Sequence, residues 1–368
     1  MTNQETNSIL ALLQALPQPV FCAQDGKVCF CNLAAQEQLV RTGEPVTTYL
    51  SQEDGLYDSI TPDMPAQLSV RLAGKCCSAS VHDLGGVRVF IAEAPDSDTL
   101  RADTLLSVSR GMTGALTSLF ASAESFFPIL EEAENDEYQR HMSEMNRAMY
   151  QLLRLRCNLT DMYAAMSGEL RLHREKVEIV PYFDDLFYQL RHLCLDAGVQ
   201  LDTTLPPRIF PGWIDKQRVE QLILMLLSNA LKYAEKGDTL SLRVDRMGER
   251  ILIRLSDSGA GMDAGILSTA FSRYDRTVQL EDARNGVGLG LPIVRHIAQL
   301  HGGAVMLQAA PDGGTCVSVS LSIKAPDEAE RSLKSPVAAM DYAGGFRHDL
   351  IELSVVLPRE TYDTRNID

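Results

Sequence analysis

The chain has 368 residues, 45% of them hydrophobic, so it is long enough for two or three domains with separate cores. Its formal charge is -15, from 34 Lys and Arg against 49 Asp and Glu, and a polyanion would be repelled. This balance excludes a general nucleic-acid binder. No apolar run approaches the roughly 20 residues that span a bilayer, and the start, MTNQETNSIL, lacks a signal-peptide pattern, so we expect a cytoplasmic protein.

The first part of the chain, residues 1–97, predicts a small α+β unit. A short helix (9–16) leads through two prolines to strands VFCA and VCFC, joined by the turn QDGK, and Asn32 then caps another helix. Three β-rich runs follow, separated by glycines, which predicts a hairpin-rich sheet: QLSVRLA, CCSASVH and VRVFIA. This order resembles a PAS sensory domain, and ALPQPVFCAQDGKVCFCNLAA is similar to its opening. The resemblance implies a small-molecule sensor or a domain that mediates dimer contacts.

The cysteines raise a second reading of this region. Eight cysteines without a regular framework fit reduced thiols better than disulfides. Four of them cluster in the first hundred residues, so a soft-metal or redox site is one interpretation: Cys29, Cys31, Cys76 and Cys77. No CxxC pair is present and His82 is the one histidine nearby, which favours small buried side chains instead.

A change to helical periodicity at Thr99 predicts a two-helix hairpin over residues 98–168. Apolar residues recur at steps of three and four in the first helix: Leu105, Val108, Met112, Leu116, Leu119 and Phe120. After the polar loop EEAENDE, a second helix (138–166) turns these side chains inward: Met142, Met145, Met149, Leu152, Leu153, Leu159 and Met162. Two helices alone leave an apolar seam uncovered, so we expect a homodimer whose hairpins form a four-helix bundle.

Residues 169–324 alternate helix and strand signals and carry four motifs in fixed order: LLSNALKYA (226–234), DSGAGM (257–262), FSRYDR (271–276) and NGVGLGLPIV (285–294). On a helix, Asn229 would turn its carbonyl toward a magnesium ion while Lys232, one turn on, reaches a phosphate. Asp257 ends the apolar strand ILIRLS, where its carboxylate can accept from an adenine amino group. The glycine-rich turn leads into a helix whose N-terminus suits phosphate oxygens.

These motifs resemble the N, G1, F and G2 boxes of the histidine-kinase ATP-binding domain, a Bergerat-fold ATPase built as an α/β sandwich. The segment DGGTCVSVSL (312–321), with Thr315, is similar to the family's last glycine box, and Asp215 matches the usual approach to the N box. The resemblance covers residues 169–324 and implies ATP and Mg²⁺ as cofactors. It assigns magnesium to Asn229 and the nucleotide to Lys232 and Tyr233. The adenine is assigned to Asp257 with Gly259 and Gly261, and the γ-phosphate to Arg276, with Arg273 as second choice. The hinge of the lid is assigned to Gly286, Gly288 and Gly290.

The phosphoacceptor motif departs from the family. Its form there is SHExxTPL, and the matching segment is SRGMTGALT (109–117), with Arg110 at the acceptor histidine and Gly111 at the adjacent acid. A guanidinium has no nitrogen lone pair free to attack phosphorus. Met225, one turn before Asn229, replaces the polar residue that this position usually holds, which argues against fast ATP hydrolysis.

Three functions compete at this stage. The leading hypothesis is a two-component-type signalling protein of multidomain α+β architecture that binds Mg-ATP but does not phosphorylate itself, a pseudo-histidine kinase. The second is an active kinase that phosphorylates a histidine of a partner kinase, or a non-standard histidine of its own, and so feeds a response regulator. The third is a stand-alone regulatory ATP-binding module. The last segment (325–368) begins as a charged linker, and FRHDLIELSVVL then predicts a helix that docks on its own domain or on a partner.

Overall fold

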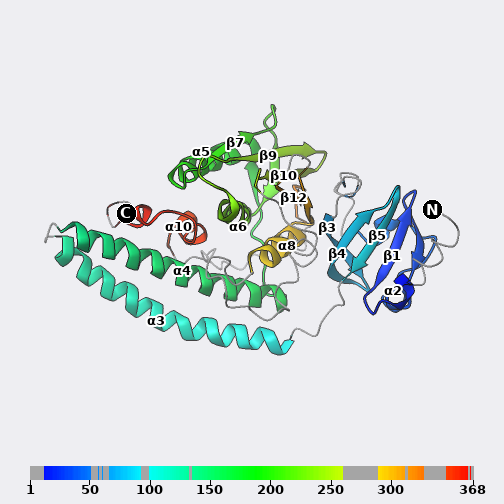
Figure 1. The fold of residues 1–368 in the computed structure, drawn as a ribbon, viewed down its shortest axis with the longest axis horizontal. Helices are drawn as coiled ribbons and strands as arrows, with labels where there is room; N and C mark the ends of the chain where they lie inside the picture. Colours follow the sequence, from blue (N-terminus) through cyan, green and yellow to red (C-terminus); the bar gives the residue numbers. More distant parts are fainter. Residues whose placement is uncertain are drawn as a thin grey trace. The chain divides into compact units, whose positions relative to one another are not determined.

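The computed structural model describes residues 12–50, 57, 60, 66–92, 99–131, 135–259, 289–310, 314–326, 345–363 and 365 (Figure 1). Helices occur together with mainly antiparallel strands, which confirms the predicted α+β class at that level. The chain forms two compact units. The first comprises Met1–Ser97, Val244–Arg276 and Ala298–Ser322, and the second comprises Asp98–Arg243, Thr277–Ile297 and Ile323–Asp368.

The first unit begins with an antiparallel sheet in the order β2-β1-β5-β4-β3. Its strands are β1 (Val20–Gln24), β2 (Lys27–Cys31), β3 (Ala66–Leu72), β4 (Lys75–Asp83) and β5 (Val87–Ala92). The predicted turn between β1 and β2 is present, with Asp25 and Gly26 both at positive φ, as a tight two-residue hairpin requires. Asn32 caps the short helix α2 (Leu33–Glu37) by accepting from the Ala35 N–H at 2.9 Å. A single 3-10 turn, η1, covers Val46–Thr48.

The core of this unit is apolar and includes two of the four thiols predicted to be buried, whereas the prediction was wrong for Cys29, which is exposed. Phe21 and Phe90 stack with ring centroids 4.5 Å apart, and Cys31 and Cys77 pack in the same cluster. Burial raises the pKa of Cys22 to about 12, so this thiol stays protonated at neutral pH. Among the residues that the structure describes, no group of three or more His, Cys, Asp or Glu side chains is arranged to hold a metal ion.

The same unit contains three strands from later in the sequence, β10 (Arg250–Ser256), β11 (Val305–Ala309) and β12 (Thr315–Ser322). Strand β12 pairs antiparallel with both β10 and β11, and β11 in turn pairs with β3. Buried aliphatic residues recur in all three strands, among them Ile253, Leu307 and Val319, which explains why apolar runs such as ILIRLS form strands here. The end of β10 therefore delivers Asp257 from a rigid support.

The second unit begins with the predicted hairpin of α3 (Thr99–Glu131) and α4 (Asp136–Met166). Asn135 caps α4 by accepting from the Glu137 N–H at 2.8 Å. In α3 four hydroxyl groups donate to the carbonyl one turn back along the helix: Thr113, Thr117, Ser122 and Ser125. Facing the other helix, Ser109 Oγ lies 2.6 Å from Thr160 Oγ1.

The burial of α4 departs in part from the sequence prediction. Met142, Met149 and Leu153 are buried, as predicted, but Met145 and Leu152 are 43% and 40% exposed in the single chain. They lie seven residues apart, and Tyr138, seven residues earlier, is also 42% exposed. Helical residues at this spacing share a face, so Tyr138, Met145 and Leu152 form an exposed apolar stripe beside the buried face of Met142 and Met149.

The rest of the second unit surrounds the helix α6 (Lys216–Tyr233). It contains the helices α5 (Ile179–Asp196) and α8 (Gly290–Leu300, whose residues through Ile297 belong to this unit), and the antiparallel pair β6 (Glu175–Glu178) and β8 (Pro211–Ile214). Strand β7 (Gln200–Thr204) runs parallel to the start of β9 (Thr239–Met247). The final segment forms α10 (His348–Glu352) and the 3-10 turn η4 (Arg359–Tyr362), and it docks on its own chain. None of the helices within the described ranges has the length and apolar character to cross a membrane.

Candidate nucleotide-binding site

Helix α6 carries the N-box residues. Asp215 caps it by accepting from the Arg218 N–H at 3.1 Å, and the same carboxylate accepts from the His173 N–H at 2.7 Å. Most of the helix is buried, including Met225 at 1% exposure, which places no polar side chain at that position. Asn229 and Lys232 lie at the C-terminal end, where they are half-buried, and Tyr233 is 56% exposed. The three N-box candidates thus lie together on one turn of a well-anchored helix.

The surroundings of Lys232 lower the pKa of its ammonium group. Burial, and then the positive charge of Arg154, lower the pKa of Lys232 to about 8. At pH 7 the ammonium is still mostly protonated, so it remains a cation, but a destabilised one. A phosphate group placed beside it would restore the balance of charge. This property fits an anion-binding role.

The start of α8 lies close to Asn229. A Cβ added at Gly290 would come 3.9 Å from Asn229 Nδ2, so the helix terminus and the amide side chain are neighbours. The N–H groups in the first turn of an α-helix have no partner within the helix and attract anions. An amide oxygen, a cation and a helix N-terminus are therefore close together in the second unit, and this set suits a magnesium-bound phosphate.

In the first unit, Asp257 is held by the backbone at the end of β10. Its Oδ1 atom accepts from the N–H groups of Gly259 and Thr315, each at 3.1 Å, and its own N–H donates to the Thr315 carbonyl at 3.0 Å. Gly314 has φ +85°, and a Cβ there would lie 2.1 Å from the Asp257 carbonyl oxygen. The carboxylate thus has a fixed position, as recognition of a base edge requires.

The site residues predicted from the sequence fall into three groups. Asn229, Lys232, Tyr233 and Gly290 belong to the second unit. Asp257, Gly259 and Thr315 belong to the first. The remaining candidates lie outside the described residues: Gly261, Arg273, Arg276, Gly286 and Gly288.

Residue 110, which the sequence predicts to be the acceptor position, lies on the surface of α3. Arg110 and Gly111 are exposed, whereas the preceding Ser109 is 3% exposed and hydrogen-bonded to Thr160. The helix therefore exposes Arg110 at this predicted position. No carboxylate follows it in the sequence, since Gly111 has no side chain.

The sequence analysis missed two features beside these candidates. Gly314 was not singled out, although the double glycine in DGGT signals a backbone position at positive φ. Arg154 of α4 was also missed: its Nη2 donates to Ser228 Oγ at 3.1 Å, directly before Asn229 in the sequence. No local pattern could reveal that contact, because the two residues are 74 positions apart.

Comparisons with known proteins agree with the motifs. Residues 214–325 match the family described as histidine kinase-, DNA gyrase B- and HSP90-like ATPase. Sensor protein KdpD of Escherichia coli is 30% identical over 237 residues, which cover 64% of this chain and 26% of that protein. Histidine protein kinase DivJ of Caulobacter vibrioides is 27% identical over 61% of this chain and 37% of its own length.

A third relative shows the same coverage. Sensor histidine kinase TmoS of Ectopseudomonas mendocina is 26% identical over 63% of this chain and 24% of its own length. The chain therefore spans between about a quarter and two fifths of the curated relatives that it matches. The chain contains a domain of the histidine kinase-, DNA gyrase B- and HSP90-like ATPase family at residues 214–325, and over some 60% of its length it is similar to sensor histidine kinases of two-component signalling.

Proposed function

We propose that this protein is a two-component-type signalling protein that binds Mg-ATP and does not phosphorylate itself. The observation that carries the proposal is the pairing of an ATPase-family domain with Arg110 on the exposed face of α3. Asn229 would bind magnesium, Lys232 and Tyr233 the phosphates and sugar, and Asp257 the adenine. Gly259, Gly261, Thr315, Arg276 and the lid glycines Gly286, Gly288 and Gly290 would complete the nucleotide site.

The chemistry follows from the side chains. Magnesium, when bound, would neutralise phosphate charge, and the amide oxygen of Asn229 is a ligand type that it accepts. The Asp257 carboxylate would accept a hydrogen bond from the exocyclic amino group of the base. Its position depends on the N–H groups of Gly259 and Thr315, so the same backbone that holds Asp257 would select the base.

Nucleotide binding is the first part to test. Titration calorimetry with a non-hydrolysable ATP analogue and Mg²⁺ should show one site per chain, and Asp257→Asn should weaken it by about 10- to 100-fold, because a hydrogen bond to a charged group is removed. Asp245→Asn is the matched control: this acidic residue of β9 pairs with Arg254 at 3.4 Å, and its replacement should leave the affinity unchanged. Equal binding by all three proteins would remove the proposed site.

The missing acceptor is tested separately. Incubation with γ-labelled ATP should leave the protein without acid-labile phosphate, and Arg110→His alone should also fail, since no acid follows it. The double variant Arg110→His, Gly111→Glu restores both groups and should gain label if the ATP-binding domain is competent. Phosphohistidine on the unmodified chain would contradict the proposal.

A second candidate is an active kinase that phosphorylates a histidine of another protein and thereby feeds a response regulator. Its support is the similarity to sensor histidine kinases over about 60% of the chain. Mixing the protein with labelled ATP and a partner hairpin that retains its histidine separates the two. Label on the partner, and none on this chain, would establish the second function.

Residues 1–97 are proposed to act as the PAS-like input domain, residues 98–168 as the dimerisation hairpin and residues 169–324 as the ATP-binding domain. The order of secondary structure in the first unit supports the input role, since a five-stranded antiparallel sheet with short helices is present. Homodimerisation through the hairpin is supported by the exposed apolar stripe of α4.

A further inference from the structure

The C-terminal segment 345–363, here called the strap, is packed into the second unit. It contains α10 and η4, and five of its large apolar side chains are at most 1% exposed: Leu350, Ile351, Leu353, Leu357 and Tyr362. Burial of five such side chains is worth roughly 1.5–3 kcal/mol each. The strap is therefore part of the packed structure of this unit.

Hydrogen bonds and aromatic contacts attach the strap to the hairpin. Asn146 and Gln151 of α4 donate to the carbonyls of Tyr362 and Ser354, each at 3.1 Å, and Arg147 Nε donates to the same Ser354 carbonyl at 3.1 Å. Phe346 packs on Phe120 of α3 with ring centroids 4.6 Å apart. The strap therefore contacts both helices of the hairpin, α3 and α4.

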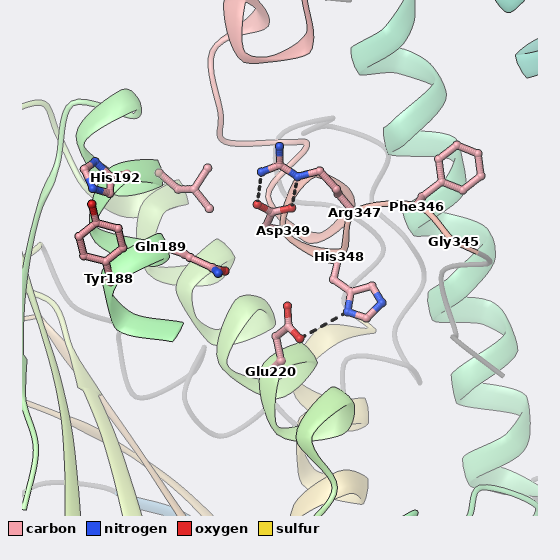
Figure 2. Close-up of a pocket in the computed structure, with 10 residues that line it drawn as sticks. Tyr188, Gln189, His192, Glu220, Gly345, Phe346, Arg347, His348 and Asp349 are labelled. Carbon is pink, nitrogen blue, oxygen red and sulfur yellow. Dashed lines mark hydrogen bonds and ion pairs between the residues drawn. The ribbon is translucent and has the colours of Figure 1, made fainter. Parts of the chain in front are cut away.

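The strap also reaches the helix that carries the N box. Glu352 has no exposed surface, and its Oε2 lies 3.2 Å from Arg154 Nε. Arg154 in turn donates to Ser228 of α6. At the strap's other edge His348 Nδ1 lies 3.5 Å from Glu220 of α6 (Figure 2). Arg154 of α4 therefore contacts both the strap and α6, and His348 adds a direct contact between the strap and α6.

On the side of α5 the strap borders an open space. A cavity of about 670 Å³ lies between its first residues and α5, lined by Tyr188 and His192 of α5 and by Arg347 and Asp349 of the strap (Figure 2). The strap therefore contacts α4 and α6, and the cavity lies on the side that faces α5.

The ion pair between Glu352 and Arg154 carries an energetic cost because it is buried. Burial raises the pKa of Glu352, and the ion pair with Arg154 opposes that rise only in part. A buried ion pair gains little net stability over apolar packing, whereas a buried charge without its partner costs several kcal/mol. The pair therefore favours one arrangement of the strap, α4 and α6 while adding little to the overall stability. The Glu352–Arg154 pair is called the latch below.

We propose that the strap is an intramolecular lock that holds the N-box end of α6 against helix α4, and that its release lets this end move while the Asp161 contact with Arg218 and Gln221 still joins the two helices. Locked and released states would differ in the freedom of α6 relative to α4. The occupant of the docking surface is thus a segment of the chain itself. The signalling consequence rests on the proposed function, but the lock is a mechanical property that exists without nucleotide.

Distances between two spin labels, measured by pulsed electron paramagnetic resonance, test the lock directly. Spin labels on exposed Arg140 of α4 and Asp185 of α5, with Cys29 and Cys76 replaced by serine, should report one narrow distribution in the complete chain. Dilution with unlabelled chain removes distances between protomers. A chain ending at residue 344 should give a broad distribution that extends to longer distances. An unchanged distribution, or loss of the helical circular dichroism signal on shortening, would overturn the lock.

Point variants test the latch without removing the strap. Glu352→Ala leaves Arg154 without this carboxylate and should broaden the distribution, whereas the double variant Arg154→Leu, Glu352→Leu replaces the pair by apolar side chains and should restore a narrow one. Arg359→Ala is the matched control, because its pair with Glu144 lies at the same segment but is exposed. Broadening by Arg359→Ala equal to that by Glu352→Ala would contradict a role for the buried pair. These measurements need no nucleotide, so they can fail or succeed independently of ATP binding.

Discussion

At the scale of single residues, Gly314 shows how backbone conformation and close approach combine to hold a carboxylate. Its φ of +85° favours glycine, and the site where a Cβ would lie is occupied by the Asp257 backbone. Two separate penalties therefore apply to any substitution. A control position with only the first penalty exists in the same unit, since Gly248 has φ +62° and open space around it.

We expect Gly314→Ala to destabilise the protein by about 1–3 kcal/mol more than Gly248→Ala, because both strain the backbone but only the former places an atom against Asp257. Urea unfolding followed by circular dichroism measures both variants. Nucleotide affinity should fall in Gly314→Ala and stay constant in Gly248→Ala. Equal free energies of unfolding would show that the backbone of Asp257 moves aside at no cost.

His296 provides a pH dependence. Burial, and then the charge of Arg295, lower the pKa of this α8 histidine to about 4. Because the folded pKa lies below the unfolded value near 6.5, His296 favours the folded state above pH 6.5, and this stabilisation is lost as the pH falls toward 4. We expect a loss of about 2 kcal/mol from this group between pH 7 and pH 5.

The variant His296→Gln isolates this contribution from the other groups that titrate in the same range. Its free energy of unfolding should decline less than that of the unmodified protein between pH 7 and pH 5. Chemical denaturation at several pH values gives the comparison. Parallel curves for the two proteins would show that His296 takes up its proton without cost.

Sequence reasoning succeeded at this scale where chemistry is local. The cap by Asn32, the turn at Asp25 and Gly26, and the buried thiols Cys31 and Cys77 were predicted and confirmed, since each depends on a few neighbouring residues. Arg154 could not be found in this way. Its role arises from contacts with Ser228 and Glu352, which lie 74 and 198 positions away.

At the scale of elements, the hairpin and helix α6 are joined by a buried polar cluster. Asp161 of α4 is 4% exposed, accepts from Arg218 Nη1 at 2.9 Å and from Gln221 Nε2 at 2.7 Å, and so links the two helices. Gln221 is fully buried, so its amide depends on partners within the protein. The sequence predicted both helices but gave no sign of this link, because polar residues within apolar faces have no periodic signature.

We expect Asp161→Ala to lower the free energy of unfolding by about 3–5 kcal/mol, since it removes the carboxylate from a buried pair and leaves polar groups without that acceptor. Glu175→Ala is the control. Its pair with Lys216 has a similar distance of 3.0 Å but is about half exposed on both sides, so the loss should stay below about 1 kcal/mol. Similar losses in the two variants would show that the α4–α6 link is not desolvated.

At the scale of the whole molecule, the exposed stripe of α4 bears on assembly. The sequence placed Met145 and Leu152 inside the hairpin, and that prediction was wrong for the single chain because helical period alone does not say which of two apolar faces meets which neighbour. Their exposure leaves an apolar surface that a second hairpin would cover. The expectation of a four-helix bundle stays a prediction.

We expect light scattering after size-exclusion chromatography to give the mass of two chains. The variant Met145→Glu, Leu152→Glu should weaken association by at least about 100-fold, because it removes apolar burial from both protomers and adds like charges. Leu195→Glu, at a 63% exposed position of α5, should leave the mass unchanged. A monomeric unmodified protein, or a dimer insensitive to the α4 variant, would exclude this interface.

The side-chain hydroxyl groups of α3 that donate to carbonyls one turn back affect how easily this helix bends. Serine and threonine side chains that donate to the carbonyl one turn back compete with the backbone and bend helices, and α3 has four of them as well as Gly111 and Gly114. Helix α4 has fewer such features along a similar length. Helix α3 is therefore the more easily bent of the two helices, so a force on the hairpin would curve α3 before it curves α4.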